Sequence, residues 1–193
     1  MGYEVARALH SAIDVFLVRK LGVPGEEELA LGAIASGGVR VLNRELIKHL
    51  RLSQATVEEV TAREQRVLDA REQLYREGRP PIPVRNRRVV LVDDGLATGA
   101  SMLAAARALR PSGAQEVIIA VPVAPRQSCE ELRREADQVL CAATPEPFGA
   151  VGLWYEDFAQ VTDEEVRNLL ARAAQEALAE WGGGQTSLFT GYA

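Results

Sequence analysis

Residues 89–101 have the sequence VVLVDDGLATGAS. Its first four residues are apolar and mostly β-branched, which predicts a strand buried on both faces, as in a parallel sheet. Asp93 and Asp94 follow where that strand ends, and a short loop with two glycines leads into residues 100–106, which are typical of the first turns of a helix. The stretch therefore predicts one strand–loop–helix unit of an α/β protein.

This unit has the features of a site for a phosphorylated sugar. Ligands of open α/β sheets bind outside the carboxyl ends of the strands. A helix N-terminus presents unpaired N–H groups to a phosphate, and glycine lets the backbone approach it closely. Two carboxylates one step upstream can accept hydrogen bonds from sugar hydroxyls. The alternative, an ordinary turn between a strand and a helix, explains neither the paired acids nor the Thr-Gly spacing.

The order of a hydrophobic run, two acids, three residues and Thr-Gly resembles the phosphoribosyl diphosphate (PRPP) motif of type I phosphoribosyltransferases. The resemblance implies that Asp93 and Asp94 form the catalytic pair and hold the ribose 2′- and 3′-hydroxyls. It implies that the 5′-phosphate is bound by Ala97, Thr98, Gly99, Ala100 and Ser101. The implied reaction transfers ribose 5-phosphate from PRPP to a nitrogen base, with release of diphosphate, as in nucleotide salvage.

The cofactor implied by this reaction is Mg²⁺. We expect it to be bound mainly by oxygens of PRPP or diphosphate and by water, because Mg²⁺ at phosphates keeps few protein ligands. We therefore predict no dedicated protein metal site. The two histidines, His10 and His49, lie outside the motif and receive no catalytic role.

Composition limits the class of protein. The chain has 193 residues, of which 47% are hydrophobic and 25% charged, and this fits one soluble domain. Its net charge of −5 gives no electrostatic case for nucleic acid. The two cysteines, Cys129 and Cys141, predict neither a disulfide framework nor a zinc site. With no signal peptide and no apolar run long enough for a membrane, we expect a cytoplasmic protein.

Strand-like and helix-like segments alternate along the chain, which predicts a doubly wound, mostly parallel sheet of the type I phosphoribosyltransferase kind. A small hairpin and helix insertion is expected before the PRPP strand. Residues 1–181 would form a single domain and residues 182–193 a flexible tail. The expected elements are helix 2–10, strand 13–18, hairpin 29–42, a short helix after Asn43, helix 56–77, strand 89–92, helix 100–110, strand 116–123, helix 127–136, strand 138–141 and helix 162–181.

Two segments are candidates for binding diphosphate. Arg19 and Lys20 follow the predicted strand 13–18, where a parallel sheet would present them to an anion. In the family, a basic residue near the matching strand end often approaches diphosphate, although a solvated strand end is the alternative. Helix 56–77 is either a charged surface helix or part of a mobile cover, in which case Arg63 and Arg66 would meet diphosphate on closure.

A later segment, residues 145–158, contains four of the chain's ten aromatic residues. Trp and Tyr offer flat faces on which a base can stack. The order Val-Gly-x-aromatic-x-x-Asp resembles the late segment of purine-type phosphoribosyltransferases. The resemblance implies that Trp154 or Tyr155 stacks on the base and that Asp157 hydrogen-bonds to it. The alternative is that these aromatics seal the sheet edge against the last helix.

The resemblance begins near residue 3, after the point where type I members carry a helix, a strand and a diphosphate-binding loop. We therefore expect the sugar-phosphate half of the site to be intact and the diphosphate half to be incomplete. A missing strand would expose a sheet edge, so a homodimer is among the expected forms. The alternative function is a non-catalytic PRPP- or nucleotide-binding regulatory module, or an inactive fragment. A P-loop NTPase is disfavoured because the chain has no GxxxxGK[ST] sequence.

Overall fold

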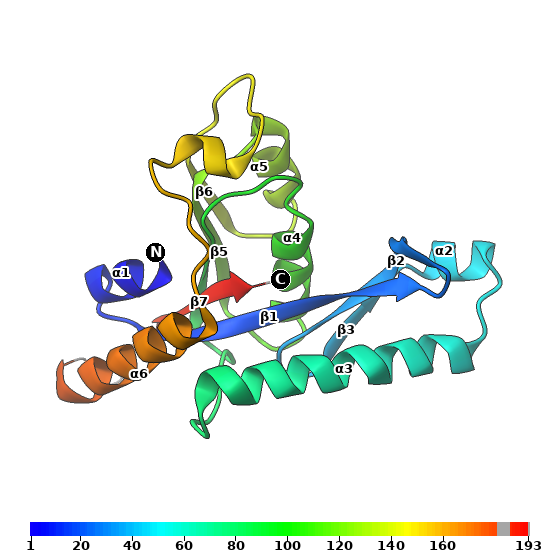
Figure 1. The fold of residues 1–193 in the computed structure, drawn as a ribbon, viewed down its shortest axis with the longest axis horizontal. Coiled ribbons are helices and arrows are strands. Elements are labelled where there is room, and N and C mark those ends of the chain that lie inside the picture. The colour runs from blue at the N-terminus through cyan, green and yellow to red at the C-terminus, as the bar shows by residue number, and fades with distance from the viewer. Residues whose placement is uncertain (181–185, 193) are drawn as a thin grey trace.

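The computed structural model describes residues 1–180 and 186–192, which form a seven-stranded sheet with helices on both faces (Figure 1). The strand order is β3-β2-β1-β7-β4-β5-β6. The strands are β1 (Ala12–Val23), β2 (Glu26–Ala35), β3 (Val39–Leu42), β4 (Arg88–Val92), β5 (Glu116–Val123), β6 (Gln138–Ala143) and β7 (Thr186–Tyr192).

The sheet is parallel from β1 through β7, β4 and β5 to β6, whereas β2 and β3 are added antiparallel at one side. The helices are α1 (Gly2–Ala8), α2 (Arg44–His49), α3 (Gln54–Arg76), α4 (Ala100–Leu109), α5 (Arg126–Leu132) and α6 (Asp163–Glu180), with a 3₁₀ turn, η1 (Val151–Trp154). None of the helices among these residues is long and apolar enough to cross a membrane. The predicted α/β class, with its mostly parallel sheet and its hairpin and helix before β4, is confirmed.

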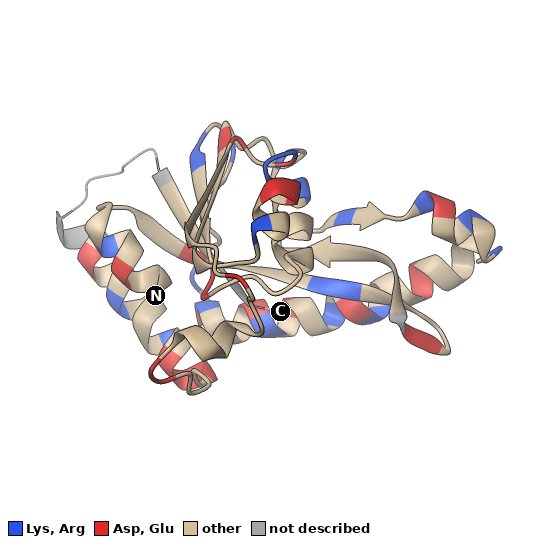
Figure 2. Ribbon diagram, turned by 90° about the horizontal axis from the view of Figure 1, so that it is seen from above, with Lys and Arg blue, Asp and Glu red and all other residues tan. Residues whose placement is uncertain are grey.

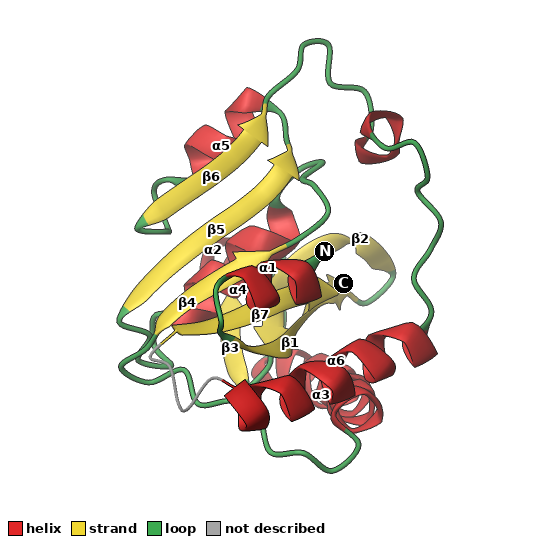
Figure 3. Cartoon of the chain, turned by 90° about the vertical axis from the view of Figure 1, so that its left-hand side faces the viewer, coloured by secondary structure: helices red, strands yellow, loops and turns green. Residues whose placement is uncertain are grey.

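Helices α4 and α5 cover one face of the sheet, and α1, α3 and α6 cover the other (Figure 3). Strand β1 contributes apolar side chains to both faces of the sheet, because successive side chains of a strand point in opposite directions. Phe16 and Val18 pack in the cluster with α4, whereas Val15 and Leu17 pack in the cluster with α3. The four apolar residues of β4 that opened the sequence analysis are all buried.

The helix boundaries follow local capping chemistry. The side chain of Asn43 accepts a hydrogen bond from the N–H of Leu46, as predicted for α2. Thr162 and Glu165 form a capping box before α6. Helix α3 begins at Gln54, two residues before the expected start at 56, because Ser53 caps it by accepting from the Thr56 N–H at 3.0 Å.

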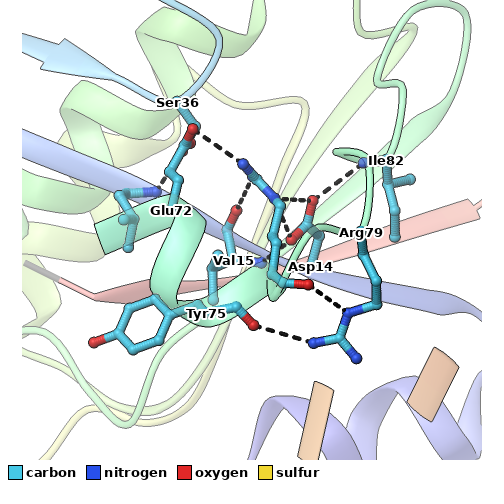
Figure 4. Close-up of polar contacts among 9 residues, drawn as sticks. Asp14, Val15, Ser36, Glu72, Tyr75, Arg79 and Ile82 are labelled. Atoms are coloured by element: carbon cyan, nitrogen blue, oxygen red, sulfur yellow. Dashed lines mark hydrogen bonds and ion pairs between the residues drawn. The ribbon is translucent and has the colours of Figure 1, made fainter. Parts of the chain in front are cut away.

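A buried ion pair fixes the C-terminal end of α3 to the start of β1 (Figure 4). The Arg76 Nε donates to both carboxylate oxygens of Asp14 at 3.0 Å, and its Nη2 donates to the Val15 carbonyl at 3.2 Å. Asp14 also accepts from the backbone N–H of Ile82 at 3.1 Å. Glu72 Oε2 lies 3.0 Å from Arg76 Nη1, so the buried guanidinium is compensated by two carboxylates.

Strand β1 is longer than expected, and this changes the position of the cationic pair. The sequence places Arg19 and Lys20 at a strand end, but β1 continues through them to Val23. The continuation is stabilised by antiparallel pairing with β2, which runs from Val18↔Ala35 to Val23↔Glu26. Pairing with β7 ends at Leu17↔Tyr192, so the parallel part of the sheet stops just before Arg19.

The prediction of a flexible tail is wrong for residues 186–192, which form β7 in the middle of the sheet. This strand pairs with β1 on one side and β4 on the other, and Ser187, Leu188 and Phe189 are buried. The segment contains several β-favouring side chains. It forms a strand only because it pairs with β1 and β4, which lie 90 and more residues away in sequence. The rest of the predicted tail, residues 182–185 and 193, lies outside the described residues.

The expectation that the cysteines form no disulfide is also wrong. Cys129 of α5 and Cys141 of β6 are bonded, with an S–S distance of 2.11 Å. Cys129 is buried on the side of α5 that packs against the sheet. Spacing alone does not reveal this pairing, because a helix and the following strand bring together residues that are 12 positions apart.

Candidate functional site

The PRPP-like motif lies at the carboxyl edge of the parallel sheet, as the sequence predicts. Strand β4 ends at Val92, Asp93 and Asp94 follow it, and α4 begins at Ala100. Asp93 is half-buried and Asp94 is exposed. The two acids and the N-terminus of α4 are therefore on the side where open α/β sheets bind ligands.

The environment of the two acids favours their protonated forms. Burial raises the pKa of Asp93 to about 6, the nearby Asp94 charge adds to this, and the Asp94 N–H, donated at 3.0 Å, opposes it. Partial burial also raises the pKa of Asp94, although hydrogen bonds from the backbone N–H groups of Asp94 and Gly95 act in the direction of lowering it. A ligand that donates hydroxyl hydrogens would stabilise the ionised pair.

The loop between the acids and α4 requires both of its glycines. A Cβ at Gly95 would lie 2.7 Å from Val151 Cγ1 and 3.0 Å from the Val123 carbonyl oxygen. Gly99 caps α4 in the left-handed region with φ +73°. The side chains of the predicted phosphate-binding residues Ala97, Thr98, Ala100 and Ser101 are exposed around it. One side of the loop therefore packs against the protein, and the other side is exposed to solvent.

Helix α5 supports this loop from the protein side. The Ser128 hydroxyl donates to the Ala97 carbonyl at 3.2 Å. Leu132 and Ser128 are the residues nearest to Gly99 on its side-chain face. The role of Ser128 was not predictable from the sequence, because no local pattern relates α5 to a loop about 30 residues earlier.

Of the predicted base-binding residues, the structure brings Tyr155 to the motif. Its hydroxyl donates to the backbone carbonyl of Asp94, and its ring packs against Phe158 with centroids 5.2 Å apart. Trp154 instead donates its indole N–H to the Phe148 carbonyl at 3.0 Å. Asp157 accepts from the Ala159 N–H at 2.9 Å within its own turn. Trp154 and Phe158 stay about half exposed, so they do not seal the sheet edge.

The predicted cationic residues line a cavity of about 520 Å³ beside the motif. Arg19 and Lys20 enter it from β1, and Ala100 and Ser101 enter it from the first turn of α4. Helix α3 contributes Arg63 and Glu64, but Arg66 is not among the described residues of its wall. Three cationic side chains, the carboxylates of Glu27 and Glu64 and the first turn of α4 therefore line one cavity.

Within residues 1–180 and 186–192, no group of three or more His, Cys, Asp or Glu side chains is placed to hold a metal ion. The carboxylates at the motif are the adjacent pair Asp93 and Asp94. One or two carboxylates together with phosphate oxygens are an ordinary ligand set for Mg²⁺. The donor set thus fits a Mg²⁺ ion that arrives with a phosphorylated ligand.

Comparison with known proteins agrees with this geometry. The phosphoribosyl transferase domain family matches residues 6–153. Two Mycobacterium tuberculosis proteins named "Putative phosphoribosyl transferase", Rv0571c and MT0597, are 43% identical over 176 residues, which is 91% of this chain. The chain spans 40% of the length of these curated relatives.

A solved structure gives the same result for the fold. The crystal structure of TT1426 from Thermus thermophilus superposes with a TM-score of 0.77 at 43% sequence identity, covering 94% of this chain and 82% of that one. The family match includes the whole motif, both acids and the loop, and it ends within η1, just before Trp154. Together these findings show that the chain belongs to the phosphoribosyl transferase domain family.

Proposed function

We propose that this chain binds PRPP at the carboxyl edge of its sheet and transfers ribose 5-phosphate to a nitrogen base. The observation that carries the proposal is the arrangement around one loop. An acid pair precedes the loop, a helix N-terminus follows it, and a cavity with arginine and lysine in its wall lies beside it. These three features suit the hydroxyls, the 5-phosphate and the diphosphate of PRPP, respectively.

In this proposal each part of the motif has one task. Asp93 and Asp94 accept hydrogen bonds from the ribose hydroxyls, and the amides and hydroxyls of residues 97–101 bind the 5-phosphate. The bond between the anomeric carbon and diphosphate breaks, and diphosphate leaves with the electron pair. A nitrogen lone pair of the base then forms the new bond to that carbon, and the proton of the base passes to water or to diphosphate. The carboxylates stabilise the positive charge that develops on the sugar ring.

We assign Mg²⁺ the role of neutralising charge on the diphosphate. It would be held chiefly by ligand oxygens and water; the protein carboxylates nearby are Asp93 and Asp94 of the motif and Glu27 and Glu64, which line the cavity. Arg19 and Lys20 would supply further positive charge from β1. The protein then acts mainly by positioning its two substrates and by stabilising the leaving group.

The aromatic segment after β6 is the proposed base site. Tyr155 is anchored to the backbone of Asp94, so the rings of Tyr155 and Phe158 lie at the acid pair. Trp154, with an exposed ring, is the second stacking candidate, and Asp157 is the candidate for hydrogen bonding to a purine-like base. Flat aromatic faces of this kind can stack on any nucleobase.

Release of diphosphate separates the enzyme from the alternative, a PRPP- or nucleotide-binding regulatory module or inactive fragment. Protein, Mg²⁺ and PRPP would be mixed with a panel of purine and pyrimidine bases, and diphosphate would be measured. We expect base-dependent release that Asp93→Asn reduces. PRPP binding without release for any base would favour the regulatory module and contradict transfer.

We also propose a cytoplasmic location and a homodimer, both of which the sequence led us to expect. The support for a cytoplasmic location is the proposed phosphorylated substrate, whereas the Cys129–Cys141 disulfide is unusual for that compartment. Size-exclusion chromatography with light scattering measures the oligomeric state directly, and a monomer at micromolar concentration would contradict the dimer.

A further inference from the structure

Glu64 lies in the middle of α3 and is one of the few buried charged residues of the described chain. Its side chain is 11% exposed and receives hydrogen bonds from two arginines. Oε2 accepts from Arg19 Nε at 2.9 Å and from Arg19 Nη2 at 2.7 Å, and Oε1 accepts from Arg63 Nε at 3.0 Å. The sequence analysis considered the arginines of α3 but gave Glu64 no role.

These contacts keep Glu64 ionised in a partly desolvated place. Burial alone would raise its pKa, but the hydrogen bonds and charges of Arg19 and Arg63 outweigh burial and lower the pKa. The carboxylate thus joins an arginine of β1 to an arginine of α3 across the packing interface. Figure 2 shows the basic stretch of β1 beside the mixed charges of α3.

The same three residues, Arg19, Arg63 and Glu64, line the 520 Å³ cavity together with Glu27 and the first turn of α4. Glu27 Oε2 lies 3.9 Å from Arg63 Nη2. From Val18 onward, β1 pairs only with β2 among the described strands. Arg19 uses its Nε and Nη2 for Glu64, and a guanidinium has five N–H donors. The contact with Glu64 therefore leaves further N–H donors of Arg19 for a ligand while it fixes the orientation of the group.

We propose that Glu64 is a positioning residue that holds Arg19 and Arg63 in the orientation that binds the diphosphate group of PRPP. This inference rests on the proposed function, since it assigns the cavity beside α4 to diphosphate. Arginine side chains lose considerable rotamer freedom when a ligand orders them. A carboxylate that orders two of them beforehand lowers the entropic cost of binding the anion.

An alternative role for Glu64 is to balance the charge of the two arginines without positioning them. The two roles predict different results for both of the following variants. Glu64→Gln keeps the size of the side chain and removes its charge, so charge balance alone predicts tighter binding of diphosphate. Glu64→Asp keeps the charge and withdraws the carboxylate by one methylene, so charge balance predicts no change. Positioning predicts weaker binding in both variants, because both lose the two-arginine contact.

The test is calorimetric titration of the full chain with Mg²⁺–diphosphate and, separately, with ribose 5-phosphate. We expect both Glu64 variants to bind diphosphate about tenfold more weakly than the wild type. Ribose 5-phosphate, which reports on the motif alone, should change less than about twofold. Glu58→Gln is the matched control, because Glu58 accepts from Arg40 at 3.0 Å on the exposed surface of the same helix.

Diphosphate affinity that is unchanged or tighter in Glu64→Gln would overturn the positioning role. Wild-type protein that binds ribose 5-phosphate but no diphosphate would overturn the inference and leave the sugar site in place, whereas failure to bind ribose 5-phosphate contradicts the proposed function itself. Should Glu64→Gln not fold, Arg63→Gln, whose side chain is half exposed, gives the test instead. It should weaken diphosphate binding about threefold, and wild-type affinity would overturn the inference.

Discussion

Asp93 combines two opposing properties in one side chain. We propose that its carboxylate accepts a hydrogen bond from a ribose hydroxyl, yet burial raises its pKa to about 6. The folded chain therefore binds a proton at Asp93 more readily than the unfolded chain between about pH 4 and pH 6. Stability from this residue is fully present below about pH 4 and is lost as the pH rises through 6.

Asp93→Asn should therefore increase stability at pH 8 while it weakens PRPP binding. We expect a gain of about 1–2 kcal/mol in the free energy of unfolding, because the variant no longer holds a desolvated charge. Denaturant unfolding at pH 5 and pH 8 measures this, and the gain should shrink at pH 5. A variant that is equally destabilised at both values would contradict the raised pKa.

The same pKa predicts how PRPP affinity depends on pH. Affinity for the wild type should rise through about pH 6, because only the ionised carboxylate accepts two hydroxyl hydrogens. Phosphate groups of PRPP also titrate near pH 6, so the wild type must be compared with Asp93→Asn at each pH. The ratio of the two affinities should grow from pH 5 to pH 7, and a constant ratio would exclude Asp93 as the titrating group.

The buried pair Asp14–Arg76 gives a prediction about stability alone. Asp14→Asn leaves the guanidinium of Arg76 with Glu72 as its remaining carboxylate partner, and the loss of the charged hydrogen bonds to Asp14 should cost about 1.5–3 kcal/mol in the free energy of unfolding. Glu4→Gln is the control, because Glu4 pairs with Arg7 on the surface and should contribute under about 1 kcal/mol. Equal effects of the two substitutions on urea unfolding would rule out a structural role for the buried pair.

Among the secondary-structure elements, those with a strong local pattern were predictable and β7 was not. The apolar runs of β4 and β5 and the capping box of α6 specify their own structure. Residues 186–192 are short and follow a glycine run, so their sequence is equally compatible with a tail. They form a strand because they pair with both β1 and β4, and no local sequence pattern reveals that pairing.

The place of β7 can be tested with one buried residue. Leu188 is fully buried between the flanking strands, so Leu188→Ala should cost about 2–5 kcal/mol in the free energy of unfolding. Leu153→Ala is the control, because its side chain is 74% exposed and should change stability by about 0.5 kcal/mol or less. Thermal unfolding of the two variants decides, and a neutral Leu188→Ala would contradict a central β7.

The disulfide joins α5, which supports the phosphate loop, to β6. Cys141→Ser should lower the free energy of unfolding by about 2–4 kcal/mol, because the bond restricts the unfolded chain over a short loop. A dithiol reductant should lower the melting temperature of the wild type but not that of the variant. A wild-type melting temperature that is insensitive to reduction would contradict the bond.

For the whole molecule, the site is assembled from distant parts of the chain, and this sets how much of it the sequence could reveal. The position of the acids and the following loop between β4 and α4 was predictable because residues 93–101 are contiguous, whereas the binding of phosphate there stays a prediction. Glu64, Ser128 and the anchoring of Tyr155 were not, because they reach the motif from α3, α5 and η1 through tertiary packing. Strand β1 is longer than the sequence predicted, so Arg19 lies within the strand and not at its end (Figure 1).

The most direct test of the ribose-phosphate site is titration calorimetry of Mg²⁺–PRPP into the wild type and Asp94→Asn. We expect saturable binding to the wild type with one site per chain. Asp94→Asn should bind at least about tenfold more weakly, because a hydrogen bond to a charged carboxylate contributes about 1.5–3 kcal/mol. Absence of saturable binding to the wild type, or wild-type affinity in Asp94→Asn, would contradict the assignment of residues 89–101 as the PRPP site.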